Sequence, residues 1–341
     1  AVLSSFVLGS HTGLNQGFDY YDEYEMEWRK DESHNGRRAE DTTRLAGMWL
    51  EKHKSDRSFL FLHYYDPHLP YDPPQPFAGR FRSNPYAGEI AYTDKYIGRV
   101  IEKLKDLGLY DSSLIILTAD HGEMLGEHGE HEHGYFIYEA AVKVPLIVKM
   151  PDGPRGKSVN DLAGIVDIFP SICAALGIPV PAHVQGKDLT GYLTARGGSA
   201  EDRYYYSESL WPTEYGGNSL LGVVTRRWKY IQTTKPELYD LEKNPEETDN
   251  LIGKQPKRAH LLREHLKLIL EEQSYKGNSA GGGALDPETI KRLESLGYIA
   301  SAGAGQSPHF DASRPDPKDL LPQHLLALKI NLLETRKQHE E

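Results

Sequence analysis

Two side chains that could do chemistry stand together directly after a short apolar run. The run LIILT at 114–118 is predicted to be a buried strand, and Asp120 and His121 follow it at once. In open α/β sheets, ligands bind beyond the carboxyl ends of the strands. A carboxylate and an imidazole at that edge can fill two positions around a divalent cation, and Gly122 relieves crowding of the backbone. We therefore predict a site at this strand end.

The same loop continues with further histidines. His128, His131 and His133 bring the total to four histidines within thirteen residues. A solvated, histidine-rich surface loop would have the same composition. The place of Asp120 and His121 directly after the strand favours the interpretation as a site.

A second predicted strand, SFLFL at 58–62, also leads into a loop with polar, reactive residues. His63, Asp66 and His68 lie in that loop. It is stiffened by prolines at 67, 70, 73, 74 and 76. A stiff loop suits a histidine that must keep one orientation, although prolines also simply end strands and leave histidines solvated. Two strand ends that both carry His and Asp favour a shared cleft.

The elements that must position these residues alternate between helix and strand. Helices are predicted at 40–54, 90–107 and 165–177, and strands at 58–62, 114–118 and 145–149. Strands that are apolar on both faces, separated by helices, are typical of a parallel sheet covered on both sides. We predict an α/β fold with a largely parallel sheet and helices on both faces.

The pattern changes near residue 196. Short aromatic and β-branched segments predict a small antiparallel sheet, followed by a helix at 256–273. We therefore divide the chain into an α/β catalytic domain at 1–196 and a small C-terminal β subdomain with its helix at 197–275. Linkers with a short helical patch follow at 276–318, and an amphipathic helix at 319–341.

The last of these helices carries an apolar stripe. Its members are Leu321, Leu325, Leu328 and Leu332. Such a stripe does not stay exposed on a lone helix. We predict that it lies outside the catalytic core, as the start of a helical repeat that engages a protein partner. The alternative is a terminal helix packed against the small β subdomain.

Composition narrows the class of protein. The 341 residues include 39 Lys and Arg against 50 Asp and Glu, a net charge of −11, which argues against nucleic acid as the main partner. No apolar run approaches the ~18 residues of a membrane span. Cys173 is the only cysteine and is predicted to be a small core residue, so neither an internal disulfide nor a cysteine-rich zinc module can form.

These segments together resemble the sulfatases of the alkaline-phosphatase superfamily. The resemblance covers about residues 1–252 and rests on five motifs in the same order. The motifs are GLNQGFDYYD (13–22), PHLPY (67–71), YAGEIAYTD (86–94), DHGEMLGEHG with HGYFIYE and VPLIV (120–148), and LYDLEKNPEETDNL (238–251).

The resemblance implies chemical roles for four residues and a supporting role for two more. Asp120 and His121 would be ligands of the metal, which is usually calcium in this family. His68 would contact the sulfate or protonate the leaving group, and His133 falls where the family has a Lys or His that touches the sulfate. Tyr138 and Glu139 would support the loop.

Two parts of the family pattern are not found in the sequence. Sulfatases have a C-x-P-x-R or S-x-P-x-R segment whose Cys or Ser becomes the formylglycine nucleophile, and a paired-Asp segment that supplies further metal ligands. Neither occurs among these 341 residues. Because both belong upstream of the region that 1–22 resembles, we expect a truncated chain that is inactive alone, with formylglycine in the missing N-terminal segment.

Three functions remain open on this reading. The first is a metal-dependent sulfuric ester hydrolase acting on a sulfate ester. The second is a phosphodiesterase or phosphonate monoester hydrolase of the same superfamily, since phosphonate-cleaving relatives also have His at the position of His133. The third is an inactive scaffold with a partner-binding helical tail. The family is commonly periplasmic or secreted, but no signal segment is visible.

Overall fold

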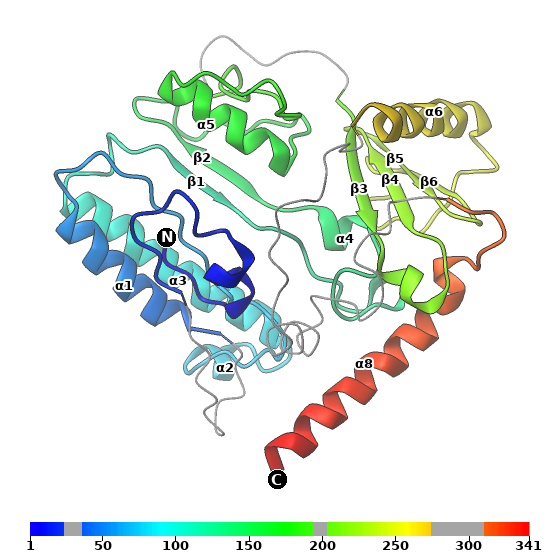
Figure 1. The fold of residues 1–341 in the computed structure, drawn as a ribbon, viewed down its shortest axis with the longest axis horizontal. Coiled ribbons are helices and arrows are strands. Elements are labelled where there is room, and N and C mark those ends of the chain that lie inside the picture. The colour runs from blue at the N-terminus through cyan, green and yellow to red at the C-terminus, as the bar shows by residue number, and fades with distance from the viewer. Residues whose placement is uncertain (24–35, 194–202, 274–309, 341) are drawn as a thin grey trace. The chain divides into compact units, whose positions relative to one another are not determined.

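The computed structural model describes residues 1–23, 36–193, 203–273 and 310–340 (Figure 1). They form two units, one of Ala1–Ser113 and one that begins at Leu114. The linker at 276–284 and the helical patch at 287–298 lie outside the described residues. No helix in the described ranges combines the length and apolarity that crossing a membrane requires.

The first unit is built on two helices that pack side by side, α1 (Ala39–Lys52) and α3 (Pro85–Asp106) (Figure 1). The helix α3 begins where Asn84 accepts a hydrogen bond from the Ala87 N–H and Pro85 takes the first helical position. The short helix α2 (Phe77–Arg80) and two 3₁₀ turns, η1 (Phe6–Leu8) and η2 (Ser10–Thr12), complete it. Both helices were predicted, although α3 starts five residues earlier than expected.

The segment at 58–62 pairs in parallel, as predicted, but only through one bridge between Val2 and Leu62. The Val2 N–H donates to the Phe61 carbonyl at 2.9 Å, and the His63 N–H donates to the Val2 carbonyl at 3.0 Å. Phe59 and Phe61 are 62% and 43% exposed. The prediction of a strand buried on both faces is therefore wrong for this unit, because alternate side chains of the run point outward.

The second unit begins with the strands β1 (Ile115–Thr118) and β2 (Leu146–Lys149), which pair antiparallel with Ile116 opposite Val148. The prediction of parallel pairing is wrong for these two strands. Parallel neighbours need a crossover that runs over the sheet. Here the connection contains only the 3₁₀ turn η3 (Glu127–Gly129) and the four-residue α4 (Glu139–Val142), and it returns the chain in the opposite direction.

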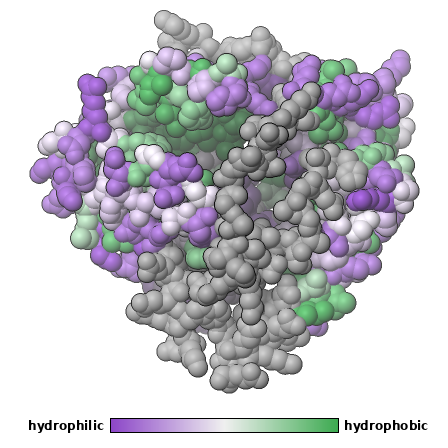
Figure 2. All heavy atoms as spheres, in the orientation of Figure 1, coloured by the Kyte–Doolittle hydropathy of each residue, from purple (hydrophilic) through white to green (hydrophobic). Residues whose placement is uncertain are grey.

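The helix α5 (Ile168–Leu176), which follows the turn η4 (Ile165–Asp167), lies over this strand pair (Figure 1), and its Ile168 lines a small apolar cavity with Ile116 and Val148. Cys173 is buried on the inner side of α5, as predicted. The outer side is also apolar, and hydrophobic residues gather over α5 (Figure 2). The exposed members are Ile165, Val166, Phe169 and Leu176.

The small antiparallel sheet that was predicted after residue 196 is confirmed and has four strands. Its strands β3 (Tyr205–Ser209), β4 (Leu220–Val224), β5 (Trp228–Gln232) and β6 (Glu237–Asp240) pair in that order, all antiparallel. The helix α6 (Pro256–Gln273) covers one face, where Leu221 packs with Leu262 and Leu266. The turn η5 (Trp211–Tyr215) joins β3 to β4.

The opposite face of this sheet holds the segment that follows the histidine-rich loop. Ile137 and Tyr138 pack there with Leu220, Ile231 and Tyr239 in one buried cluster. At Gly222 a Cβ atom would lie 2.8 Å from the end of the Ile137 side chain, so Ile137 packs closely against the strand at this glycine. The sheet thus fixes the end of the loop that carries the predicted site.

The final helix is α8 (Pro317–Glu340), close to the predicted span. It belongs to the second unit. Its first turns contact the rest of that unit, since Leu321 packs against the cluster around Tyr135 and the Tyr135 hydroxyl donates to the Pro317 carbonyl at 2.7 Å. These turns follow the alternative in which the helix packs near the β subdomain. The helical repeat and the domain boundaries stay predictions.

Candidate active site

Asp120 and His121 follow β1 directly, as the sequence predicted. Their place is set by Gly122, whose N–H donates to the Ala141 carbonyl at 2.7 Å. A Cβ atom on residue 122 would lie 2.1 Å from the Ala140 carbonyl oxygen. Glycine is therefore required where this loop presses against α4.

The two side chains face each other at the surface. The Asp120 carboxylate is 80% exposed, and its Oδ2 lies 3.7 Å from His121 Nε2. The other ring nitrogen of His121, Nδ1, lies 2.8 Å from the Gly122 carbonyl oxygen. If Nδ1 carries the proton and donates to that carbonyl, the lone pair of Nε2 points toward the Asp120 side, an arrangement typical of metal-binding histidines.

His133 joins this pair from thirteen residues further along the chain. Its ring stacks on His121 with centroids 3.8 Å apart. Its Nδ1 lies 3.0 Å from Oε1 of Glu123, whose carboxylate is 5% exposed. Burial lowers the pKa of His133, but the hydrogen bond and charge of Glu123, with Glu132 and Asp120, outweigh it, so the pKa is raised. The structure brings three predicted residues together in one place.

Glu123 was not singled out from the sequence. The only available signal is its place directly after the Asp-His-Gly triplet, in a loop with several other acidic residues. Because its hydrogen bond and charge raise the pKa of His133, Glu123 belongs to the electrostatics of the site.

The loop between Gly122 and Tyr138 is held by a buried glutamate. The Glu130 carboxylate accepts hydrogen bonds from the backbone N–H groups of Tyr135 at 3.0 Å and Phe136 at 2.9 Å. Burial raises the pKa of Glu130 to about 7. Across the base of the loop, the Met124 N–H donates to the Glu132 carbonyl at 2.9 Å. His133 is therefore carried by a closed, internally bonded loop.

The remaining loop histidines do not join the site. His128 stacks on Tyr138 with ring centroids 3.6 Å apart, and burial lowers its pKa. His131 is exposed. Tyr138 and Glu139 support the loop, because the Tyr138 hydroxyl donates to Glu237 at 3.1 Å and Glu139 pairs with the buried Lys229 at 3.2 Å.

His68 lies in the first unit, in the proline-rich loop. Its ring stacks on Tyr65 with centroids 4.3 Å apart, and its Nδ1 lies 2.7 Å from the Leu69 carbonyl oxygen. Its backbone N–H donates to the Glu89 carboxylate at 3.1 Å, and the Asp72 N–H donates to the same carboxylate at 2.8 Å. The loop therefore has a fixed backbone around His68.

Glu89 and Asp66 form a buried acidic pair beneath this loop. Arg38 lies 3.3 Å from the Asp66 carboxylate and 3.6 Å from that of Glu89. Burial raises the pKa of Glu89 to about 7 and also raises that of Asp66. The Asp66 carboxylate accepts a hydrogen bond from the Ala39 N–H at 2.8 Å. Asp66 thus satisfies the first N–H of α1.

The side chains around Asp120 offer only part of a metal-binding shell. Within the part of the chain that the structure describes, no group of three or more His, Cys, Asp or Glu side chains converges on one point. Asp120 and His121 nevertheless suit two positions of a larger shell, since one offers an exposed carboxylate and the other a ring nitrogen on the same side. A hard cation such as Ca²⁺ is coordinated by about six to eight oxygen atoms in all.

Two known protein families match parts of this chain. Residues 5–178 match the family described as Sulfatase, and residues 126–276 match the family described as N-sulphoglucosamine sulphohydrolase, C-terminal. The first match covers half of the chain and includes all four predicted site residues. This chain belongs to the sulfatase family.

Curated relatives carry sulfatase names. The chain is 30% identical over 202 residues to an N-acetylglucosamine-6-O-sulfatase of Bacteroides thetaiotaomicron, covering 57% of this chain and 36% of that protein. It is 30% identical over 223 residues to arylsulfatase K of Homo sapiens, covering 62% and 41%. The chain spans between about a third and a half of the length of the curated relatives it matches.

Solved structures share the fold. The Bacteroides fragilis protein yidJ superposes with a TM-score of 0.59 at 23% identity, covering 70% of this chain and 60% of that one. The phosphonate monoester hydrolase SpPMH from Silicibacter pomeroyi gives a TM-score of 0.55 at 25% identity, covering 80% and 69%. The fold is thus the mixed α/β fold of alkaline-phosphatase-like sulfatases.

Proposed function

We propose that these residues carry part of the active site of a metal-dependent sulfuric ester hydrolase. The observation that supports this most directly is the group of Asp120, His121 and His133, in which Glu123 lies 3.0 Å from Nδ1 of His133 and raises its pKa. Family membership supports the same reaction class. The substrate is a sulfate ester, and the reaction is hydrolysis of its S–O bond.

The residues of this chain would bind a divalent cation and the sulfate group and would transfer a proton. Asp120 and His121 would hold a divalent cation, with Ca²⁺ as the first choice because a carboxylate is a hard ligand. When bound, such a cation polarises the sulfate. Protonated His133 can donate a hydrogen bond to a sulfate oxygen while Glu123 keeps its ring in place. His68, on its stiff loop, would contact the sulfate or protonate the leaving oxygen.

The nucleophile lies outside what these residues supply. None of the 341 residues forms the C-x-P-x-R or S-x-P-x-R segment from which formylglycine arises. We propose that the complete protein carries this segment and the paired aspartates elsewhere in its sequence. The 341-residue chain on its own would then not turn over substrate.

The central test uses the natural full-length protein and a chromogenic aryl sulfate. We expect His133→Ala to lower kcat by about 10²–10⁴-fold, as general acid–base groups do. The matched control is His131→Ala, since His131 is exposed in the same loop and should leave kcat unchanged. Equal rates for both variants would refute the role of His133.

The metal assignment needs a separate measurement. We expect Asp120→Asn to lose bound calcium, measured by elemental analysis of the purified protein, while its fold is retained. Asp161→Asn, a change at another exposed aspartate of the second unit, is the control. Wild-type metal content in Asp120→Asn would contradict the assignment.

A second function is favoured by one specific observation. A phosphonate monoester hydrolase matches over 80% of this chain, and a histidine stands at position 133. Parallel assays with an aryl phosphonate monoester decide between the two. A kcat/KM for the phosphonate ester above that for the sulfate ester would replace the sulfatase assignment.

The relatives' names suggest which sugar carries the sulfate ester in the natural substrate. Two curated relatives are named N-acetylglucosamine-6-O-sulfatase and N-acetylgalactosamine-6-O-sulfatase. We propose 6-O-sulfated amino sugars as the first natural substrates to assay. Release of sulfate from them, measured by ion chromatography, would support this choice, and hydrolysis of aryl sulfates alone would refute it.

A further inference from the structure

The C-terminal segment reaches the loop that carries His133. The Tyr135 hydroxyl, two residues beyond His133, donates to the Pro317 carbonyl at 2.7 Å. The Tyr135 ring stacks on His324 with centroids 4.5 Å apart and planes inclined by 21°. A Cβ atom on Gly129, at the tip of the loop, would lie 3.0 Å from the Leu321 side chain. These contacts join parts of the sequence that are more than 180 residues apart.

His324 is the centre of this contact and is 2% exposed. The Tyr215 hydroxyl lies 3.1 Å from its Nδ1, and the Trp211 ring meets it edge-on with centroids 5.5 Å apart. Burial lowers the pKa of His324 to about 4, so it is neutral at physiological pH. It therefore acts as a flat, uncharged ring that fills the space between α8, η5 and Tyr135.

Polar contacts fix the same segment before the helix begins. The Asn218 side chain both donates to the Asp311 carbonyl and accepts from the Asp311 N–H, each at 2.8 Å. The Asp316 carboxylate accepts from the Lys235 N–H at 2.7 Å and pairs with Lys318 at 3.0 Å. Because Asp316 is buried and Asn218 is fully buried, these contacts hold residues 310–318 in one position.

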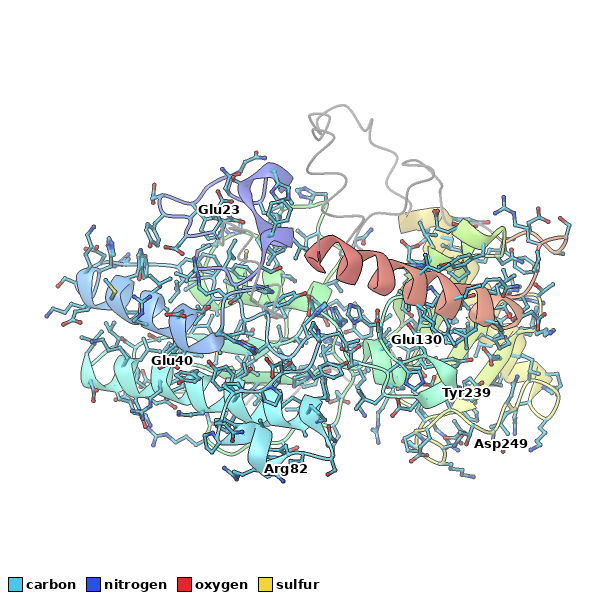
Figure 3. All side chains as sticks on the ribbon, turned by 90° about the horizontal axis from the view of Figure 1, so that it is seen from below. Glu23, Glu40, Arg82, Glu130, Tyr239 and Asp249 are labelled. Carbon is cyan, nitrogen blue, oxygen red and sulfur yellow. The ribbon has the colours of Figure 1, made fainter. Side chains whose placement is uncertain are left out.

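Within the loop that carries His133, further contacts connect Tyr135 to the proposed active site. Glu130, labelled in Figure 3, accepts the N–H groups of Tyr135 and Phe136, and the preceding Gly129 approaches the Leu321 side chain of α8. The chain passes from His133 through Gly134 directly into Tyr135. A displacement of Tyr135 would therefore move the backbone on which His133 stands.

We propose that residues 310–328 are a strap that positions the His133 loop, with His324 and Tyr135 as positioning residues that act through His133. This inference rests on the proposed function only for its effect on catalysis. The structural part concerns the loop itself. Without the strap, the loop at 124–136 would keep its Glu130 hydrogen bonds but lose the surface against which Tyr135 packs.

The first experiment measures hydrogen exchange in the full-length protein, comparing His324→Ala with Leu326→Ala. Leu326 lies on the same helix and is 59% exposed, so it is the matched control. We expect the amides of Met124 and Gly126 to exchange at least about tenfold faster in His324→Ala, because local opening becomes easier. Amides of β4 and β5 should not change. Unchanged exchange at Met124 and Gly126 would overturn the proposal.

The second experiment is kinetic. We expect His324→Ala to lower kcat for the sulfate ester by about tenfold with little change in KM, since misplacing a catalytic group costs rate more than binding. His324→Phe, which retains a flat ring against Tyr135, should restore most of kcat. A loss that only matches the fraction of unfolded protein, or no loss at all, would refute the positioning role.

A third variant keeps the test valid if His324→Ala does not fold. Tyr135→Phe removes one hydroxyl and its bond to Pro317, and it should show the same faster exchange on a smaller scale. If wild-type protein hydrolyses no sulfate ester, the proposed function fails, and hydrogen exchange alone then decides whether the strap holds the loop.

Discussion

Two loops of the molecule carry the histidines proposed to act on the substrate, and each is held by one buried glutamate. In the first unit, Glu89 accepts the backbone N–H groups of His68 and Asp72. In the second, Glu130 accepts those of Tyr135 and Phe136. Burial raises the pKa of both glutamates to about 7. In both loops a buried carboxylate thus accepts two backbone N–H groups, although the sequences around the two glutamates differ.

The surroundings of the two glutamates differ. Glu89 stands on α3 with Arg38 at 3.6 Å, under a loop stiffened by five prolines. Glu130 belongs to its own loop, and within the described residues it forms no ion pair with Lys or Arg. The His68 loop is therefore positioned by a neighbouring helix and by its own composition. The His133 loop depends instead on distant segments, the β subdomain and α8.

The largest expected effect comes from deleting each carboxylate. Glu89→Ala leaves two partly buried N–H groups without an acceptor, and Glu130→Ala leaves two buried ones. Such a loss costs about 1–3 kcal/mol for each buried group. We expect each variant to lose about 2–5 kcal/mol of unfolding free energy in urea titrations. Glu89→Ala should lose more, because Arg38 also loses a partner.

The control for this pair is Glu102→Ala on α3, where the carboxylate is 64% exposed. Its unfolding free energy should stay within about 0.5 kcal/mol of wild type. If Glu130→Ala behaves like this control, the parallel between the two loops fails.

The second prediction concerns pH. Both glutamates titrate near 7 in the folded protein, against an ordinary value of 4.5. Between these values the folded state binds more protons than the unfolded state, so stability is highest below about pH 4.5 for these groups and falls as pH rises through 7. Each glutamate would then contribute a loss of roughly 3 kcal/mol across that window.

Urea titrations at several pH values between 5 and 8 measure this slope. In Glu89→Gln and Glu130→Gln the contribution of that residue should disappear, which makes the variant's stability flatter with pH than that of wild type. A slope identical to wild type in both variants would show that neither carboxyl is protonated near neutral pH in the folded protein.

The sequence predicted the residues of the site better than the devices that hold them. Asp120 and His121 stand out because they end an apolar run, and His133 was placed by family resemblance. Glu89 and Glu130 were missed, because a glutamate in an amphipathic helix or an acidic loop looks like a solvated one until its neighbours are known. Pairing direction was missed for a related reason: LIILT and PLIVK carry no information on whether the chain between them crosses the sheet or folds back.

The third prediction concerns Asp66, one of two carboxylates that accept an N–H group at the start of a helix. Asp66 accepts the Ala39 N–H at the start of α1, and Glu247 accepts the Glu139 N–H at the start of α4. Removal of a helix cap costs about 0.5–2 kcal/mol. We expect Asp66→Asn, which keeps an oxygen acceptor, to cost about 1 kcal/mol in urea titrations, and Asp66→Ala to cost about twice as much. Equal costs would mean that the charge facing Arg38, and not the cap, carries the effect.

The smallest effects should come from exposed ion pairs, one in each unit, that join a helix to a neighbouring segment of the same unit. Glu51 of α1 pairs with Lys103 of α3 at 2.9 Å, and Asp319 of α8 pairs with Lys235 at 2.6 Å. Exposed pairs contribute little, because water screens them and long side chains lose freedom in forming them. We expect Glu51→Gln and Asp319→Asn each to shift Tm by no more than about 1 °C, measured by calorimetry in low salt. At 1 M NaCl, where the screening length is about 3 Å, both shifts should vanish.

A larger, salt-sensitive loss for Asp319→Asn alone would mean that charge at the surface holds α8 in place. The buried contacts of His324 and Tyr135 would then not be what fastens the strap to the His133 loop.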